Sequence, residues 1–170
     1  MAWVYLAVRV FHVLLGAFWA GSILFSALIL DPAVREAGPE GGKVMGVIQR
    51  RGWMSTILTI AALTVVSGLY LLWVMSGRFS PGFMGSRPGI LLSVGMLAAV
   101  LALGIGLTLT RPTAARMGEI SGRMASAGGS PSPDDLAELA RLRDRMTTLL
   151  RAVSVLLVIA VVTMALGPHV

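Results

Sequence analysis

The chain has 170 residues, of which 56% are hydrophobic and only 13% are charged, whereas a soluble domain is typically about 45–50% apolar and about 25% charged. This composition is typical of an integral membrane protein, and the lack of cysteine excludes disulfides, thiolate metal sites, iron–sulfur clusters and cysteine nucleophiles. The net charge of +6 does not indicate a nucleic-acid partner, because the basic residues flank apolar segments, where membrane topology accounts for them.

Four apolar segments, at about residues 3–30, 53–76, 88–110 and 148–167, dominate the sequence. Each reaches the roughly 20 residues that a helix needs to cross a hydrocarbon core of about 30 Å. Each must be helical in lipid, because a helix satisfies its backbone polar groups within one segment. The fold predicted for residues 1–170 is therefore one all-α membrane domain, an antiparallel bundle of four transmembrane helices.

The first apolar segment is too long for a secretory signal peptide and has no basic region before it, so we expect it to be retained. It carries two strongly polar residues, Arg9 and His12, within RVFHVLLGAFWAGS at residues 9–22. At 100° per residue, one stripe about 100° wide contains Tyr5, Arg9, His12, Gly16, Trp19, Ile23 and Ser26.

A charged side chain within a span is costly, so it usually faces the bundle or reaches toward an interface. Arg9 lies about two turns from the outer end and can extend to the headgroups. His12 lies about one turn deeper, beside Gly16, which leaves room for another backbone or a flat ligand. We therefore interpret His12 as a ligand or proton-handling residue, with a structural hydrogen bond as the alternative.

The connection at 31–52 begins with DPAVREAGPEGG, in which Asp31–Pro32 predicts a helix start and the glycines predict a break. The following QRRGW, with Arg50 and Arg51 beside Trp53, is typical of an interfacial anchor.

Basic residues are concentrated in two of the three connections. The connections 31–52 and 111–147 hold Arg35, Lys43, Arg50, Arg51, Arg116, Arg123, Arg141, Arg143 and Arg145, whereas 77–87 holds Arg78 and Arg87. The positive-inside rule then predicts that the first and third connections are cytoplasmic and that both termini lie outside.

Two residues of the second and third segments lie at the depth of His12. Counting about 1.5 Å per residue from the outer ends places Ser67 and Met96 level with it. His12 and Met96 together would form a mixed axial ligand set for haem iron, although methionine also commonly fills gaps in helix bundles. The second histidine, His169, follows Pro168 and is expected outside the membrane, so a two-histidine haem site is not predicted.

The connection at 111–147 predicts a cytoplasmic helical hairpin. In SPSPDDLAELARLRDRM, Ser132 is typical of an N-cap and Pro133 of the first helical position. The predicted helix continues into the fourth segment as far as Gly167, a length of roughly 50 Å. Residues 126–132 form the predicted turn, and 113–125 extend the third segment beyond a kink at Pro112. A stripe of Leu136, Leu139, Leu142 and Met146 favours packing within the hairpin, or a surface for a larger membrane partner.

The sequences RVFHVLLGAFWAGSILF, QRRGW and TIAALTVVSGLYLL resemble those of a superfamily of small bacterial four-helix membrane proteins. It includes the HemJ-type protoporphyrinogen IX oxidases and the CopD-type copper-resistance domains, and the resemblance covers roughly residues 5–110. It implies a multi-pass protein of the bacterial inner (cytoplasmic) membrane. It also implies a functional histidine, associated with haem, at the position of His12.

The chain departs from the HemJ-type pattern at the start of the third segment, where that pattern has an essential lysine. GSRPGILLSVG contains none, and Arg87 is not equivalent because it does not deprotonate as lysine does. Porphyrinogen oxidation is therefore not predicted, and no enzymatic activity is assigned.

The leading hypothesis is a small membrane protein that binds haem b or a porphyrin in a redox role, or that keeps this scaffold as a relic. His12 and Met96 are its candidate iron ligands, Gly16, Trp19 and Ser67 line the site, and Arg9 lies beside a propionate or the headgroups. One alternative is a non-enzymatic accessory or assembly protein whose hairpin contacts a larger partner. Another is a copper-handling transporter, which the dispersed methionines do not favour. Small-residue faces also permit a homodimer.

Overall fold

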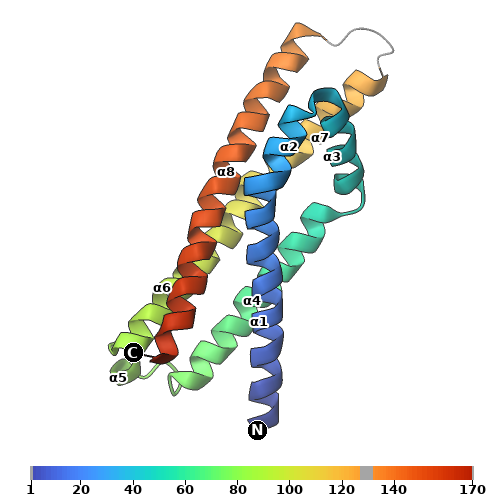
Figure 1. The fold of residues 1–170 in the computed structure, drawn as a ribbon. Helices are drawn as coiled ribbons and strands as arrows, with labels where there is room; N and C mark the ends of the chain where they lie inside the picture. Colours follow the sequence, from blue (N-terminus) through green and yellow to red (C-terminus); the bar gives the residue numbers. More distant parts are fainter. Residues whose placement is uncertain (1, 127–131, 170) are drawn as a thin grey trace.

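The computed structural model describes residues 2–126 and 132–169, and within these ranges the chain forms helices and short turns, without strands (Figure 1). The long helices are α1 (Ala2–Phe25), α4 (Trp53–Met75), α6 (Arg87–Ile105), α7 (Arg111–Ser126) and α8 (Pro133–Leu166). The shorter elements are α2 (Asp31–Glu36), α3 (Gly38–Arg50), α5 (Pro81–Met84) and a 3₁₀ turn at Gly167–His169. The start of α1, α5 and the end of α8 lie at one end of the molecule, and the end of α7 and the start of α8 lie at the other (Figure 1).

Four continuous helical runs are long and apolar enough to cross a membrane, which confirms the predicted all-helical class with four candidate spans. They are Trp3–Glu36, Trp53–Met75, Arg87–Ser126 and Pro133–Leu166. Many of their large apolar side chains are exposed, among them Val13, Val66 and Val155. Exposure of this kind suits contact with lipid tails, because a helix that is apolar all round must be covered by protein or lipid.

Small residues hold the spans together in two close pairs, α1 with α4 and α6 with α8. At Gly95 of α6, an added Cβ would lie only 2.6 Å from Thr163 Oγ1 and 3.2 Å from the Ala160 carbonyl oxygen of α8. The buried cluster between the pairs is rich in alanine: it contains Trp19, Ala20, Ile23, Ile57, Ala61, Ala98, Ala99, Ala102, Val153, Leu157 and Ala160. Such side chains let helix backbones approach closely in a membrane, where packing rather than hydrophobicity drives association.

Two π-helical turns interrupt the long runs, each just before a proline. The first, Ser26–Leu30, closes with the Asp31 N–H donating to Ser26 O, and the second, Gly106–Thr110, closes with the Arg111 N–H donating to Gly106 O. Proline lacks an N–H and its ring crowds the carbonyl four residues earlier, so a wider turn ahead of Pro32 and Pro112 accommodates the rings. The α-helix α2 begins at Asp31, as predicted, but it continues the π turn before it, so the first run passes through Pro32 without a break.

The helix break predicted at the glycines of the first connection falls at the first of them, whereas the later glycines lie within α3. Ala37 separates the two helices, and α3 runs from Gly38 through Gly41 to Arg50. Gly38 has a φ of +58°, and a Cβ on Gly41 would lie 2.3 Å from the Val34 carbonyl oxygen. Gly38 thus takes the left-handed conformation that ends α2, and Gly41 permits the tight return of α3 along α2.

Arg35 connects the first connection to α8. Its guanidinium lies 3.0 Å from Asp144 Oδ1 and donates to Thr147 Oγ1 at 2.6 Å. Thr147 in turn donates to Asp31 Oδ2 at 2.7 Å, which is also 3.4 Å from Arg35 Nε. This network fixes the position of α2 against the polar half of α8.

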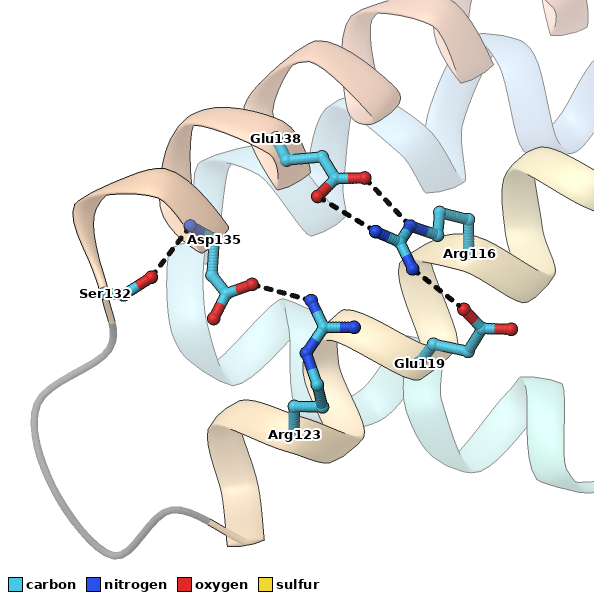
Figure 2. Close-up of polar contacts among 6 residues, drawn as sticks. All are labelled: Arg116, Glu119, Arg123, Ser132, Asp135 and Glu138. Carbon is cyan, nitrogen blue, oxygen red and sulfur yellow. Dashed lines mark hydrogen bonds and ion pairs between the residues drawn. The ribbon is translucent and has the colours of Figure 1, made fainter.

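The predicted hairpin forms, and ion pairs join its two helices (Figure 2). Arg116 Nε lies 2.8 Å from Glu138 Oε1, and Arg123 lies 2.7 Å from Asp135 Oδ1. Ser132 Oγ accepts from the Asp135 N–H at 3.1 Å, which confirms the predicted N-cap. Ile120 and Leu139 are buried between the helices, whereas Leu136 of the predicted stripe is 49% exposed. Most of the predicted turn, residues 127–131, lies outside the described residues.

Acidification is expected to loosen this hairpin. A hydrogen bond from Arg123 holds the pKa of the Asp135 carboxyl below its usual value. The depressed folded-state pKa makes the stabilisation full above about pH 4, the unfolded value, and lost as the pH falls through the folded value. Spin labels at Gly118→Cys and Ala137→Cys should give a narrow distance distribution at pH 7 that broadens below about pH 4.

The Asp135→Asn variant should lack this pH response, and Asp134→Asn, which removes the neighbouring exposed carboxyl, should keep it. Identical pH profiles in the two variants would contradict the assignment. The change is expected to be modest, because exposed ion pairs contribute little to stability.

Candidate ligand site at His12

The imidazole of His12 crosses from α1 to the backbone of α4. Its Nδ1 lies 2.9 Å from the Thr64 carbonyl oxygen and 3.1 Å from Ser67 Oγ. A carbonyl can only accept, so Nδ1 carries the proton. The Ser67 hydroxyl donates to the Leu63 carbonyl at 2.7 Å, which leaves its oxygen to accept from His12. In the neutral ring, Nε2 is then unprotonated and has a free lone pair.

Gly68 makes the approach of His12 possible. A Cβ at this position would lie 2.7 Å from His12 Cε1 and 3.3 Å from His12 Nδ1. It would also lie 3.2 Å from Cε of Met96, which reaches the same point from α6. An imidazole and a thioether side chain from two helices therefore meet over one glycine of a third.

Three of the six predicted site residues are thus brought together: His12, Ser67 and Met96. Of the other three, Gly16 lies against Thr64, which accepts the hydrogen bond from His12, whereas Arg9 and Trp19 lie elsewhere. Arg9, at the edge of the polar stripe, is exposed. The space at Gly16 faces the helix α4, because a Cβ there would lie 3.5 Å from Thr64 Cγ2, at ordinary contact distance. Trp19 is only 3% exposed and belongs to the buried cluster between the helix pairs.

Sequence reasoning missed Thr64 and Gly68, the two residues of α4 that seat the imidazole. The signal for Gly68 was present, since it follows Ser67 directly and the depth count had already placed Ser67 beside His12. Thr64 accepts from His12 through its backbone carbonyl, which every residue type has. The identity of its side chain therefore could not predict this contact.

The side chains of His12 and Met96 carry the types of donor atom that bind haem iron. A free imidazole nitrogen and a thioether sulfur form a known axial pair, and a ligating histidine usually donates its other N–H to a carbonyl or carboxylate. Among residues 2–126 and 132–169, no group of three or more His, Cys, Asp or Glu side chains gathers to hold a metal ion. Two apolar grooves of about 320 and 290 Å³ lie on the surface, and neither is lined by His12 or Met96.

Comparison with family models, with curated proteins and with solved structures finds no match for this chain. The resemblance to HemJ-type and CopD-type proteins therefore rests on the sequence segments themselves.

Proposed function

We propose that this chain is an integral membrane protein that binds haem b through Nε2 of His12. The observation that carries the proposal is the 2.9 Å hydrogen bond from His12 Nδ1–H to the Thr64 carbonyl oxygen. This bond selects the tautomer whose Nε2 can bind iron, and it orients the ring as the outer contacts of metal-bound histidines do. Met96, whose Cε meets the His12 ring over Gly68, supports the proposal as a second side chain that would hold the iron.

The proposed topology is an antiparallel four-helix bundle with 31–52 and 111–147 in the cytoplasm and both termini outside. It is supported by the excess of arginine in these two connections. The ion-paired hairpin of α7 and α8, which carries many charged side chains, suits an aqueous location. In this topology His12 would lie within the outer half of the membrane, and exposed Arg9, which lies outside the cluster of His12, Ser67 and Met96, would reach the headgroups.

Bound haem would supply one-electron transfer. The protein residues hold and orient it: Thr64 and Ser67 fix the ring of His12, and Gly68 leaves the space in which that ring lies. A methionine ligand at Met96 would favour the reduced state and raise the potential.

Haem titration of the detergent-purified protein tests the proposal. Wild-type protein is expected to develop a Soret band that saturates at one haem per chain, and His12→Gln is expected to lose it. Glutamine keeps an N–H for the Thr64 carbonyl but offers no imidazole, so the fold is retained. Met96→Leu should keep haem while changing the spectrum of the low-spin pair, and Gly21→Ala, at an open position of α1, should change nothing. A wild-type protein that stays colourless, or an unchanged band in His12→Gln, would sink the proposal.

A second candidate function, a non-enzymatic accessory or assembly role, is favoured by the hairpin. It holds its own shape through cross-helix ion pairs and presents Leu136 at 49% exposure beyond the apolar part of α8. A preformed surface of this kind suits a larger membrane partner. In the haem titration, a colourless wild-type protein would favour this role, with His12 as a packing residue.

A further inference from the structure

The connection between α4 and α6 has cations but no anions. Residues 76–87, SGRFSPGFMGSR, contain Arg78 and Arg87 and no acidic side chain. Among the ion pairs formed within residues 2–126 and 132–169, none involves Arg78. This end of the bundle therefore has positive charge that the described part of the chain does not neutralise.

The backbone holds Arg78 and its neighbour in an unusual conformation. Gly77, Arg78 and Phe79 have φ angles of 61°, 66° and 61°, in the left-handed region that residues with a Cβ avoid. Hydrogen bonds fix the turn: the Arg78 N–H donates to the Trp73 carbonyl at 2.9 Å, and the Phe79 N–H donates to Oγ of buried Ser76 at 2.7 Å. The turn thus holds the side chains of Arg78 and Phe79 in fixed positions. Glycine at these two positions would remove the backbone strain.

Phe79 lines an apolar groove of about 320 Å³ together with Val66, Leu69, Tyr70 and Trp73. The groove follows α4 for two turns, about 10 Å along the helix axis. Arg78 lies at its connection end, with its guanidinium 5.8 Å from the centre of the Trp73 ring. An aromatic belt at a membrane interface would account for Tyr70 and Trp73. It does not require a strained turn that keeps a cation over the tryptophan.

We infer that this groove binds an anionic phospholipid, whose phosphate contacts Arg78 and whose acyl chain lies along Val66, Leu69 and Trp73. The groove is apolar along α4, as an acyl chain requires, and Arg78 lies at the end where the chain would meet its headgroup. The unneutralised charge of residues 76–87 complements an anionic headgroup, such as that of phosphatidylglycerol, better than a zwitterionic one. The inference is independent of haem binding at His12.

Quenching of Trp73 by brominated lipids tests the inference in reconstituted vesicles. The full chain with Trp3→Phe and Trp53→Phe is used, so that Trp73 reports on the groove and buried Trp19 gives the same background in every variant. Dibrominated phosphatidylglycerol in phosphatidylcholine vesicles is compared with dibrominated phosphatidylcholine in the same vesicles. One cation at the headgroup should give phosphatidylglycerol an association preference of about fivefold at Trp73.

Arg78→Gln should abolish this preference, and Arg78→Lys, which keeps the charge, should retain it. Arg51→Gln, which removes an exposed arginine from the opposite end of α4, is the matched control and should also retain it. A preference that survives in Arg78→Gln, or that is lost equally in Arg51→Gln, would overturn the assignment. Loss in Arg78→Lys as well as in Arg78→Gln would also overturn it, because the turn rather than the charge would then be responsible.

Discussion

Replacing Gly89 by alanine is expected to lower the free energy of unfolding by about 2–3 kcal/mol, as overpacking against an unyielding neighbour does. A Cβ at Gly89 would lie 2.0 Å from the carbonyl oxygen of Phe83 and 3.0 Å from Cα of Met84. Both atoms belong to the backbone of α5, so no side-chain rotation relieves the clash. Alanine gains about 1 kcal/mol of helix propensity over glycine, but this gain is smaller than the cost of moving α5 away from the start of α6.

Unfolding in mixed detergent micelles, followed by circular dichroism, measures this effect. The matched control is Gly104→Ala in the same helix, where an added Cβ has nothing within 4 Å. That variant should be unchanged or more stable by up to about 1 kcal/mol. Equal stability of the two variants would show that α5 does not lie against Gly89.

Gly68→Ala is expected to displace the His12 ring and to lower the free energy of unfolding by about 2 kcal/mol. The added methyl group would lie 2.7 Å from His12 Cε1, and the ring cannot retreat without lengthening its hydrogen bond to Thr64. The clash with Met96 costs less stability, because its terminal methyl group can rotate away. In a protein that binds haem at His12, the same substitution should weaken haem binding at least tenfold, because the ligand ring is moved.

A double-mutant cycle separates this contact from a general effect of alanine in α4. In a His12→Ala background the ring is gone, so Gly68→Ala should be neutral or stabilising. The same loss of stability in both backgrounds would mean that His12 does not lie over Gly68. The cycle needs no haem, so it tests the geometry apart from the proposed function.

The sequence was sufficient to predict the elements whose signals are local. Four apolar segments matched four helical runs, and Ser132 with Pro133 marked the start of α8, because capping depends on a few adjacent residues. The path of the chain near Pro32 was not predictable in this way. Proline indicates a disturbance, but whether the helix ends or widens into a π turn depends on what the following residues, such as Arg35, contact in the fold.

Part of the candidate site followed from depth alone, since rise per residue placed His12, Ser67 and Met96 at one level. The rotation of each helix about its axis could not be predicted from the sequence. An apolar helix in lipid has only a weak sequence pattern to mark the face that packs against its neighbours. Arg9 was therefore grouped with His12, although it lies at the edge of the stripe and is exposed. The depth count also pointed to Gly68, the neighbour of Ser67, whereas its contact with the His12 ring required the face of α4 that meets α1.

The two π turns have a consequence for how this protein can change over evolution. Each turn accommodates one residue more than an α-helix would, so it resets the angular phase of everything that follows it. The phase of α2 sets the contact of Arg35 with Asp144, and the phase of α7 sets that of Arg116 with Glu138. The rotation of the polar helical segments about their axes is therefore set at the π turns, separately from that of the apolar segments. Lipid-facing residues can be substituted without disturbing the ion pairs. Deletion of a single residue from either π turn would rotate the following helix, so that the paired side chains no longer face each other.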